Sequence, residues 1–208
     1  MQKVGACLNK NELARKVIMD MGGLSKTSDF VLAGLKNDEV AALCKAGVIE
    51  RIRRGFYRLP QGDPVTDEQI IKEMIPQGII CMESALFHYE YSDFSPREWS
   101  VAVPRTASRI IKRMREVPIK AYFVQKDLFE LGKITDDFGG VSLAVYDRER
   151  VLCDCFKYRT KLDNELFNKA VNAYAVDGKK NIVNLTRYAK KMKLYSKIMN
   201  VMEVLLNG

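Results

Sequence analysis

The sequence predicts an α+β protein in two parts, a small helical part that ends in a hairpin and a larger mixed part. Apolar residues recur at helical spacing through residues 9–45, and two short alternating stretches follow. Further along the chain, short apolar strand patterns give way to four amphipathic helical patterns. Pro60-Gln61-Gly62-Asp63-Pro64 interrupts both kinds of pattern, so we place a domain boundary between residues 1–60 and 61–208.

The N-terminal part begins with a helix over residues 9–21 and continues with two short helices joined by a glycine turn. Thr27 or Ser28 can cap the first helix of this pair, and Asn37 or Asp38 can cap the second, because their side-chain oxygens accept backbone N–H groups. The first helix supplies a third surface that completes a small core.

A basic hairpin follows the helix pair. Gly47 stands where a helix ends in the left-handed conformation, and residues 48–52 and 56–59 alternate like strands. Arg53-Arg54-Gly55 between them forms a tight turn. Helix, helix-turn-helix and hairpin together predict a winged helix-turn-helix, whose second paired helix fits the DNA major groove and whose hairpin tip reaches phosphates or the minor groove.

The charge distribution favours a polyanionic partner for this part. The chain has a net charge of +8, and residues 1–60 hold 11 basic and 6 acidic side chains, a net charge of +5. Four arginines and no acidic residue lie between Arg51 and Arg58. Guanidinium groups match phosphate oxygens and guanine edges. The alternative is a solvated hairpin whose arginines only keep it soluble.

The DNA contacts expected from this arrangement come from three places: the start of the first paired helix, the second paired helix and the hairpin. Asn37 either pairs with adenine or only caps its helix, and Tyr57 either contacts a sugar-phosphate or packs in the core. The full predicted set is Ser25, Lys26, Thr27, Lys36, Asn37, Lys45, Arg51, Arg53, Arg54, Tyr57 and Arg58.

Two further basic stretches lie in the C-terminal part. Each either extends a nucleic-acid footprint, faces a protein partner, or is a solvated face, which is the commoner meaning of a charge run. The residues of this possible second basic surface are Arg105, Arg109, Lys112, Arg113, Arg187, Lys190 and Lys191.

The C-terminal part predicts a small sheet followed by a helical bundle. Thr66 and Gln69 form a capping box for its first helix, and Gly139-Gly140 forms a hairpin turn. Expected strands cover residues 78–81, 99–104, 119–124 and 141–146, and expected helices cover 66–75, 82–91, 148–159, 163–176, 181–191 and 193–206. Residues 105–115 are helical or looped, and residues 129–135 are a loop or short strand.

Catalytic signals are weak. His88 is the only histidine, and no nucleophile motif accompanies it. Cys153 and Cys155 have the wrong spacing for a zinc knuckle. We therefore expect no enzyme, no metal and no cofactor. The alternative is a nucleic-acid-processing enzyme that uses the winged helix as a substrate anchor, with Asp136, Asp137 or Asp147 in its site.

The five cysteines are an odd number and lie mostly in apolar runs, which indicates reduced thiols. No signal-like leader and no apolar run long enough to cross a bilayer is visible. The expectation is a cytoplasmic protein with no membrane contact.

Four stretches resemble one family in their order along the chain. L-C-K-A-G-V-I-E-R-I-R-R-G-F-Y-R-L-P is similar to the N-terminal winged-helix domain of AbiEi-type antitoxins. C-M-E-S-A-L-F-H-Y, W-S-V-A-V-P-R and V-Y-D-R-E-R-V-L-C-D-C-F resemble the C-terminal domain of the same family. Each stretch alone is moderately specific, and their combined order is much more so.

The resemblance implies an antitoxin of a bacterial abortive-infection system, a type IV toxin–antitoxin pair used in phage defence. Its N-terminal domain would bind inverted repeats in double-stranded DNA of its own promoter as a repressor. Its C-terminal domain would oppose a nucleotidyltransferase-like toxin without a stable complex. The resemblance also implies a monomer that binds two half-sites cooperatively.

Overall fold

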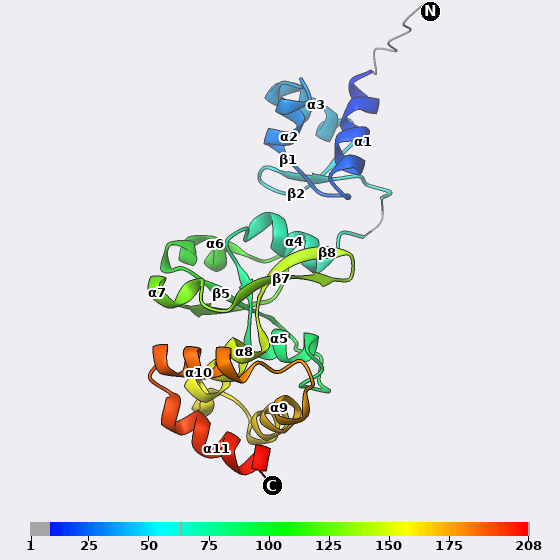
Figure 1. Cartoon of the computed structure of the whole chain (residues 1–208). Coiled ribbons are helices and arrows are strands. Elements are labelled where there is room, and N and C mark those ends of the chain that lie inside the picture. Colours follow the sequence, from blue (N-terminus) through cyan, green and yellow to red (C-terminus); the bar gives the residue numbers. More distant parts are fainter. Residues whose placement is uncertain (1–8, 63, 208) are drawn as a thin grey trace, which may run out of the picture. The chain divides into compact units, whose positions relative to one another are not determined.

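A computed structural model describes residues 9–62 and 64–207 (Figure 1). It confirms a mixed α+β fold. The chain divides into two compact units, residues up to Ile70 and residues from Ile71. This division lies within helix α4 (Asp67–Met74), downstream of the boundary predicted at residue 60. The Gln69 side chain donates a hydrogen bond to the carbonyl of Gly22 (2.6 Å), so the start of α4 belongs to the first unit.

The first unit contains the predicted helices and hairpin. Strands β1, β3 and β2 form an antiparallel sheet in that order, and only β1 was not predicted. The elements are α1 (Lys10–Asp20), β1 (Ser25–Lys26), α2 (Thr27–Leu32), α3 (Asn37–Lys45), β2 (Glu50–Arg53) and β3 (Phe56–Arg58).

A single apolar cluster holds the first unit together. Ile18 of α1, Phe30 of α2 and Val40 of α3 meet Ile49 and Tyr57 from the hairpin, and all five are buried. The Phe30 and Tyr57 rings pack edge to face with centroids 5.6 Å apart. The three helices and the sheet therefore share one core, as the apolar periodicity predicts.

The predicted caps of the paired helices are wrong. Lys26 and Lys36 occupy the cap positions, and their backbone N–H groups donate to Asp29 (2.6 Å) and Glu39 (2.8 Å) three residues on. A carboxylate in the first turn can thus satisfy the start of a helix without a short polar side chain at the cap. Residues predicted as caps lie inside the first turn instead: Thr27, Ser28, Asn37 and Asp38.

The second unit has a five-stranded sheet in the order β6-β5-β4-β8-β7. Strands β5 and β6 pair in parallel, as do β4 and β8, and the remaining pairs are antiparallel. The strands are β4 (Ile79–Ile80), β5 (Trp99–Val103), β6 (Ile119–Phe123), β7 (Lys133–Phe138) and β8 (Val141–Tyr146). Residues 129–135, predicted as a loop or short strand, span the end of helix α7 (Lys126–Phe129) and the start of β7.

Helices account for most of the rest of this unit, and they lie close to the predicted ranges except for α7, which was not predicted. The Thr66–Gln69 capping box is confirmed, with the Thr66 N–H donating to Gln69 Oε1 (2.9 Å). The helices are α5 (Met82–His88), the 3₁₀ turn η1 (Arg105–Ala107), α6 (Ser108–Arg113), α7 (Lys126–Phe129), α8 (Arg148–Lys157), the 3₁₀ turn η2 (Arg159–Lys161), α9 (Asn164–Val176), α10 (Ile182–Lys191) and α11 (Tyr195–Asn207).

Helix α8 is the centre of the second unit. It contacts α5 and β8 as well as α9, α10 and α11. It also buries charge: Arg150 is 0 % exposed, and its Nε lies 3.1 Å from Asp154 Oδ2. Burial raises the pKa of Asp154. Burial lowers the pKa of Arg150, but the Asp154 carboxylate, Tyr146 and Cys153 together outweigh this effect, so the pKa of Arg150 is raised.

Arg150 also fixes the chain before the β7–β8 hairpin. Its Nη1 donates to the carbonyls of Leu128 (2.5 Å) and Leu131 (2.8 Å), and its guanidinium lies 4.1 Å from the centre of the Tyr146 ring. The Tyr146 hydroxyl in turn donates to the carbonyl of Phe129 (2.9 Å). One buried helix thereby determines where residues 128–131 lie.

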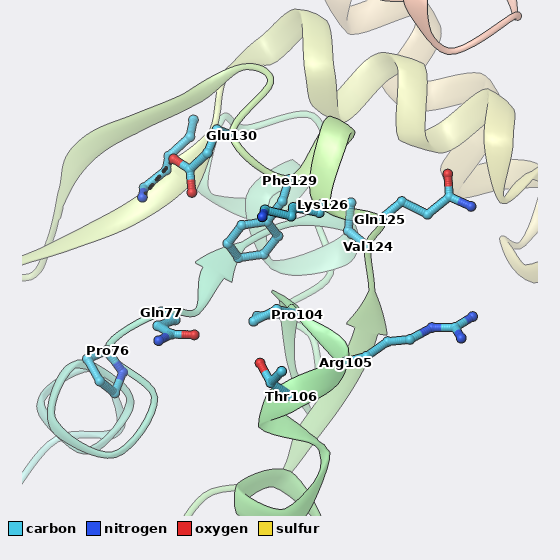
Figure 2. Close-up of a pocket in the computed structure, with 11 residues that line it drawn as sticks. Pro76, Gln77, Pro104, Arg105, Thr106, Val124, Gln125, Lys126, Phe129 and Glu130 are labelled. Carbon is cyan, nitrogen blue, oxygen red and sulfur yellow. Dashed lines mark hydrogen bonds and ion pairs between the residues drawn. The ribbon is translucent and has the colours of Figure 1, made fainter.

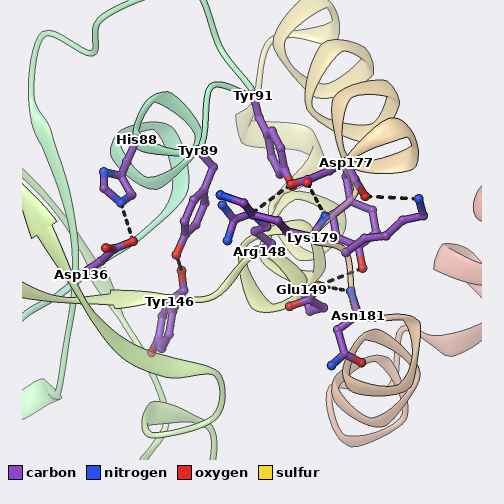
Figure 3. A network of polar contacts seen from close by, with 12 residues as sticks. His88, Tyr89, Tyr91, Asp136, Tyr146, Arg148, Glu149, Asp177, Lys179 and Asn181 are labelled. Carbon is purple, nitrogen blue, oxygen red and sulfur yellow. Dashed lines mark hydrogen bonds and ion pairs between the residues drawn. The ribbon is translucent and has the colours of Figure 1, made fainter.

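A second polar network joins the sheet to the helical bundle within this unit (Figure 3). Asp177, at the end of α9, accepts from the Tyr91 hydroxyl (2.5 Å) and from Arg148 Nε (2.9 Å). The Arg148 guanidinium stacks over the Tyr89 ring at 4.4 Å. Glu149 accepts from the backbone N–H of Asn181 (2.7 Å), so both arms of the network start from α8.

We predict that Arg150→Met lowers the free energy of unfolding by about 3–5 kcal/mol, because it leaves the Asp154 carboxylate buried without its partner. Adding Asp154→Leu should recover part of this loss, since the uncompensated charge is then removed. Trp99 is the only tryptophan and lies in β5, so its fluorescence in urea reports this unit. A single variant as stable as the parent would contradict the role of the pair.

Gly132 gives a second prediction. Its φ is +76°, and an added Cβ would lie 2.5 Å from Arg150 Cβ. Gly140 has φ +86° with open space around it, so Gly140→Ala adds backbone strain alone, about 1–2 kcal/mol. Gly132→Ala should add a steric penalty of about 1–3 kcal/mol on top of that strain. The free energy of unfolding is measured in urea. An equal decrease in the two variants would show that the close approach of Gly132 to Arg150 adds no steric penalty.

Candidate nucleic-acid interface

Helix α3 turns one face to the core and the other to solvent. Val40 and Leu43 are buried, whereas Asn37, Ala41, Ala42 and Lys45 are exposed. Because Glu39 performs the capping, the Asn37 amide makes no hydrogen bond to any described residue. The two alanines are additions that sequence reasoning missed. Small side chains let a helix approach a groove closely, and alanine can contact a thymine methyl group.

Acidic residues at the start of α3 limit this face. Glu39 pairs with Lys10 of α1 (Nζ–Oε1 2.6 Å), which raises the pKa of Lys10 and lowers the pKa of Glu39, chiefly through the hydrogen bond. Asp38 is exposed beside Asn37 and has no ion pair among the described residues. A phosphate close to the start of α3 would therefore meet a negative charge, which the count of basic residues did not reveal.

The hairpin tip is tied to the start of α2. Gly55 has φ +85°, and its carbonyl accepts the backbone N–H of Thr27 (3.0 Å). This bond fixes the Arg54-Gly55 turn against the helix pair, and Arg54 is exposed there. Lys26 lies at the same end, with its Nζ 6.0 Å from the centre of the Phe56 ring. The structure thus brings two of the three predicted contact groups together.

Two predicted contact residues are not on the surface. Ser25 is 1 % exposed and donates its hydroxyl to the Val17 carbonyl (3.4 Å). Tyr57 is 8 % exposed and packs on Phe30. The predicted DNA contact of Ser25 is contradicted, and of the two alternatives for Tyr57 the structure supports packing in the core, because strand pairing of β1 with β3 places both side chains there.

Arg58 is already paired. Glu50 stands directly opposite it in the hairpin, and the Arg58 Nε lies 2.8 Å from Glu50 Oε2. The sequence count missed this neutralisation because Glu50 precedes the arginine run. Arg51 and Arg54 remain exposed, while Arg53 is half-buried.

The predicted second basic surface does not form one patch. Figure 1 shows α6 and α10 on opposite sides of the second unit's sheet. Arg187 is partly engaged, since its Nη2 donates to Asn184 Oδ1 (2.9 Å). The members on η1 and α6 are Arg105, Arg109, Lys112 and Arg113, and those on α10 are Arg187, Lys190 and Lys191.

The carboxylates considered for catalysis each have a local partner. The Asp136 carboxylate accepts a hydrogen bond from His88 Nε2 (2.9 Å), and this hydrogen bond lowers the pKa of Asp136 (Figure 3). Asp137 accepts the N–H of Gly140 in the hairpin turn, and Asp147 caps α8. Among the described residues there is no cluster of three groups able to hold a metal ion.

The cysteines lie in apolar surroundings. Cys81, Cys153 and Cys155 are buried and free, and burial raises the pKa of each thiol. Cys44 is a free, half-buried thiol, and Cys7 lies outside the described residues. Within the described ranges, no helix has the length and apolarity needed to span a bilayer.

Comparison with known proteins gives a likeness of fold. Neither a family model nor a curated protein matches this chain. Among solved structures, it resembles the crystal structure of the RV2827C protein from Mycobacterium tuberculosis with a TM-score of 0.57. The match covers 93 % of this chain and 80 % of that chain at 14 % sequence identity. The comparison therefore shows a similar fold.

A prediction follows from the two roles of Glu39. Glu39→Gln should keep the capping hydrogen bond to Lys36 and lose only an exposed ion pair, with little change in the stability of α3. Glu39→Ala loses both and should destabilise α3 by about 0.5–2 kcal/mol. Hydrogen exchange of the α3 amides measures this locally. Equal exchange in both variants would assign the effect to the charge and not to the cap.

Proposed function

We propose that this chain is a DNA-binding autorepressor and the antitoxin of a bacterial abortive-infection, type IV toxin–antitoxin system. The resemblance of its four sequence stretches to AbiEi-type antitoxins suggests this class. In this proposal the first unit acts as a winged helix-turn-helix on inverted repeats in its own promoter. The protein works in the cytoplasm as a monomer that binds adjacent half-sites cooperatively.

The observation that carries the DNA-binding part is the anchored hairpin turn. The bond between Thr27 and Gly55 holds the Arg53-Arg54 tip beside the start of α2. Because the backbone of the tip is fixed, its guanidinium groups can meet a phosphate row with little loss of loop entropy. Asn37, Ala41 and Ala42 on the open face of α3 are the groups that would read base edges.

The antitoxin part rests on the resemblance of the second unit. In this proposal the unit opposes a nucleotidyltransferase-like toxin without forming a stable complex. The alternative, a nucleic-acid-processing enzyme, has less support, because Asp136, Asp137 and Asp147 are engaged in separate local contacts.

The direct test is a gel-shift titration of the full chain against the DNA upstream of its own gene, with scrambled competitor DNA. Specific retardation that survives the competitor is expected, and two discrete shifted bands would indicate paired half-sites. Binding that is equally weak on any sequence would overturn the repressor proposal.

We predict that Arg53→Ala with Arg54→Ala weakens operator binding and flattens its salt dependence. Each lost phosphate contact should reduce the slope of log affinity against log salt by about 0.9. The matched control is Arg15→Ala with Lys16→Ala, which removes the same charge from exposed positions of α1 in the same unit. A slope that falls equally in both pairs would indicate general charge attraction and no contact by the hairpin.

The antitoxin proposal needs its own assay. Co-expression with the toxin encoded beside it should restore growth, and the hairpin double variant should still restore growth if neutralisation belongs to the second unit. Failure of the parent chain to rescue growth would reject the antitoxin role and leave the repressor test unaffected.

A further inference from the structure

The second unit contains a cavity of about 960 Å³ that the proposed function does not use. This volume falls within the range of small-molecule sites in proteins. The cavity lies among residues 76–77, 104–106 and 124–133, all within the second unit (Figure 2).

The position of this cavity in the sheet is one at which ligands bind. Strands β5 and β6 are parallel neighbours, paired through to Val103 and Phe123. Residues 104–106 and 124–126 directly follow the two strands, so the cavity stands at their shared carboxyl edge. Open α/β sheets bind ligands outside the carboxyl ends of parallel strands.

The lining carries unpaired positive charge. It contains three cations and one acid, and that acid, Glu130, pairs with Lys133 (3.0 Å). Arg105 and Lys126 make no hydrogen bond or ion pair with any described residue. The two cations follow β5 and β6 respectively. Lys126 lies beside the Phe129 ring, whereas the exposed Arg105 side chain extends away from that ring and must change rotamer to face the same anion (Figure 2).

An aromatic face and neutral polar groups complete the lining. The half-buried Phe129 ring stands beside Lys126 and opposite Pro104 and Thr106 (Figure 2). Gln77 adds an amide that can donate and accept. Flat rings stack on aromatic side chains, and amides and hydroxyls satisfy the edges of such rings.

The segment that carries Phe129 is fixed by hydrogen bonds to its backbone. The Tyr146 hydroxyl donates to the Phe129 carbonyl (2.9 Å), and the buried Arg150 guanidinium donates to the Leu128 carbonyl (2.5 Å). The ring and Lys126 therefore stand on a positioned segment, and binding a ligand there would require little ordering of the chain.

We propose that this cavity binds a free nucleoside phosphate. The base stacks on Phe129, the phosphates lie beside Lys126, and the exposed Arg105 side chain turns toward them on binding. Guanidinium and ammonium groups both favour phosphate oxygens, and the aromatic ring explains why the ligand carries a base. The site shares no residue with the hairpin or with α3, so a test of nucleotide binding is independent of a test of DNA binding.

Calorimetric titration of the full chain tests this, with ATP, GTP, CTP and UTP separately and with pyrophosphate as the ring-free probe. Binding of at least one nucleotide is expected. Arg105→Ala or Lys126→Ala should weaken it about tenfold or more, since a hydrogen bond to a charged group contributes about 1.5–3 kcal/mol. The matched control is Arg109→Ala, an exposed arginine on neighbouring α6 that does not line the cavity.

Phe129→Leu separates stacking from charge, because it keeps an apolar side chain and removes the ring. It should weaken nucleotide binding severalfold and leave pyrophosphate binding unchanged. The hairpin double variant should bind nucleotide like the parent. Trp99 fluorescence during urea unfolding confirms that each variant is folded.

Three results would overturn the proposal. No nucleotide binding with a Kd below about 1 mM would remove the ligand. Equal weakening by Arg105→Ala and Arg109→Ala would mean general charge attraction. A 5′-phosphorylated oligonucleotide could bind more tightly than any free nucleotide and lose that binding in Arg105→Ala. This result would mean that the cavity binds the end of a nucleic-acid strand.

Discussion

The second unit depends on one buried charge. Arg150 of α8 is completely buried. Its desolvation is offset in part by Asp154, by two backbone carbonyls and by the face of Tyr146, while Arg150 Nη2 and Asp154 Oδ1 have no hydrogen-bond partner among the described residues. A buried ion pair contributes little net stability over apolar residues of the same shape, but it tolerates few other arrangements. Helix α8 is therefore fixed in register, and with it the segment that carries Phe129 and the capping residue Asp147.

The first unit has a different constraint, because its apolar core is small. Its apolar cluster takes one side of each helix and both hairpin strands, and Tyr57 is part of that cluster. The side chains that the sequence predicts to contact DNA are thus divided: some are needed inside the fold and others stay at the surface. Ser25 and Tyr57 serve the core, Arg58 serves its cross-strand partner, and the turn at Arg54 is left exposed.

Most element positions could be predicted because they depend on local signals. The capping box at Thr66, the glycine turn before β8 and the helical patterns after Asp147 all act within a few residues. Strand β1 could not be predicted, because two residues carry no alternation and pair only across the chain with β3. The caps at Lys26 and Lys36 were missed since the satisfying carboxylates lie three residues downstream.

The candidate sites show the same division between local and long-range causes. The number of arginines identified the hairpin in the sequence. The pairing of Arg58 with Glu50 depends on the register of β2 and β3, which the sequence does not show. The sequence showed Arg105 only as part of a basic stretch and gave no sign of the cavity, because Arg105 and Lys126, 21 residues apart, come to line one cavity only through parallel pairing of β5 and β6. Charge on an open turn suits a long polyanion, which makes its contacts along a row of phosphates. Charge at the edge of a sheet, beside a positioned ring, suits a small anion that must be enclosed, since a concave site removes more of its surface from water.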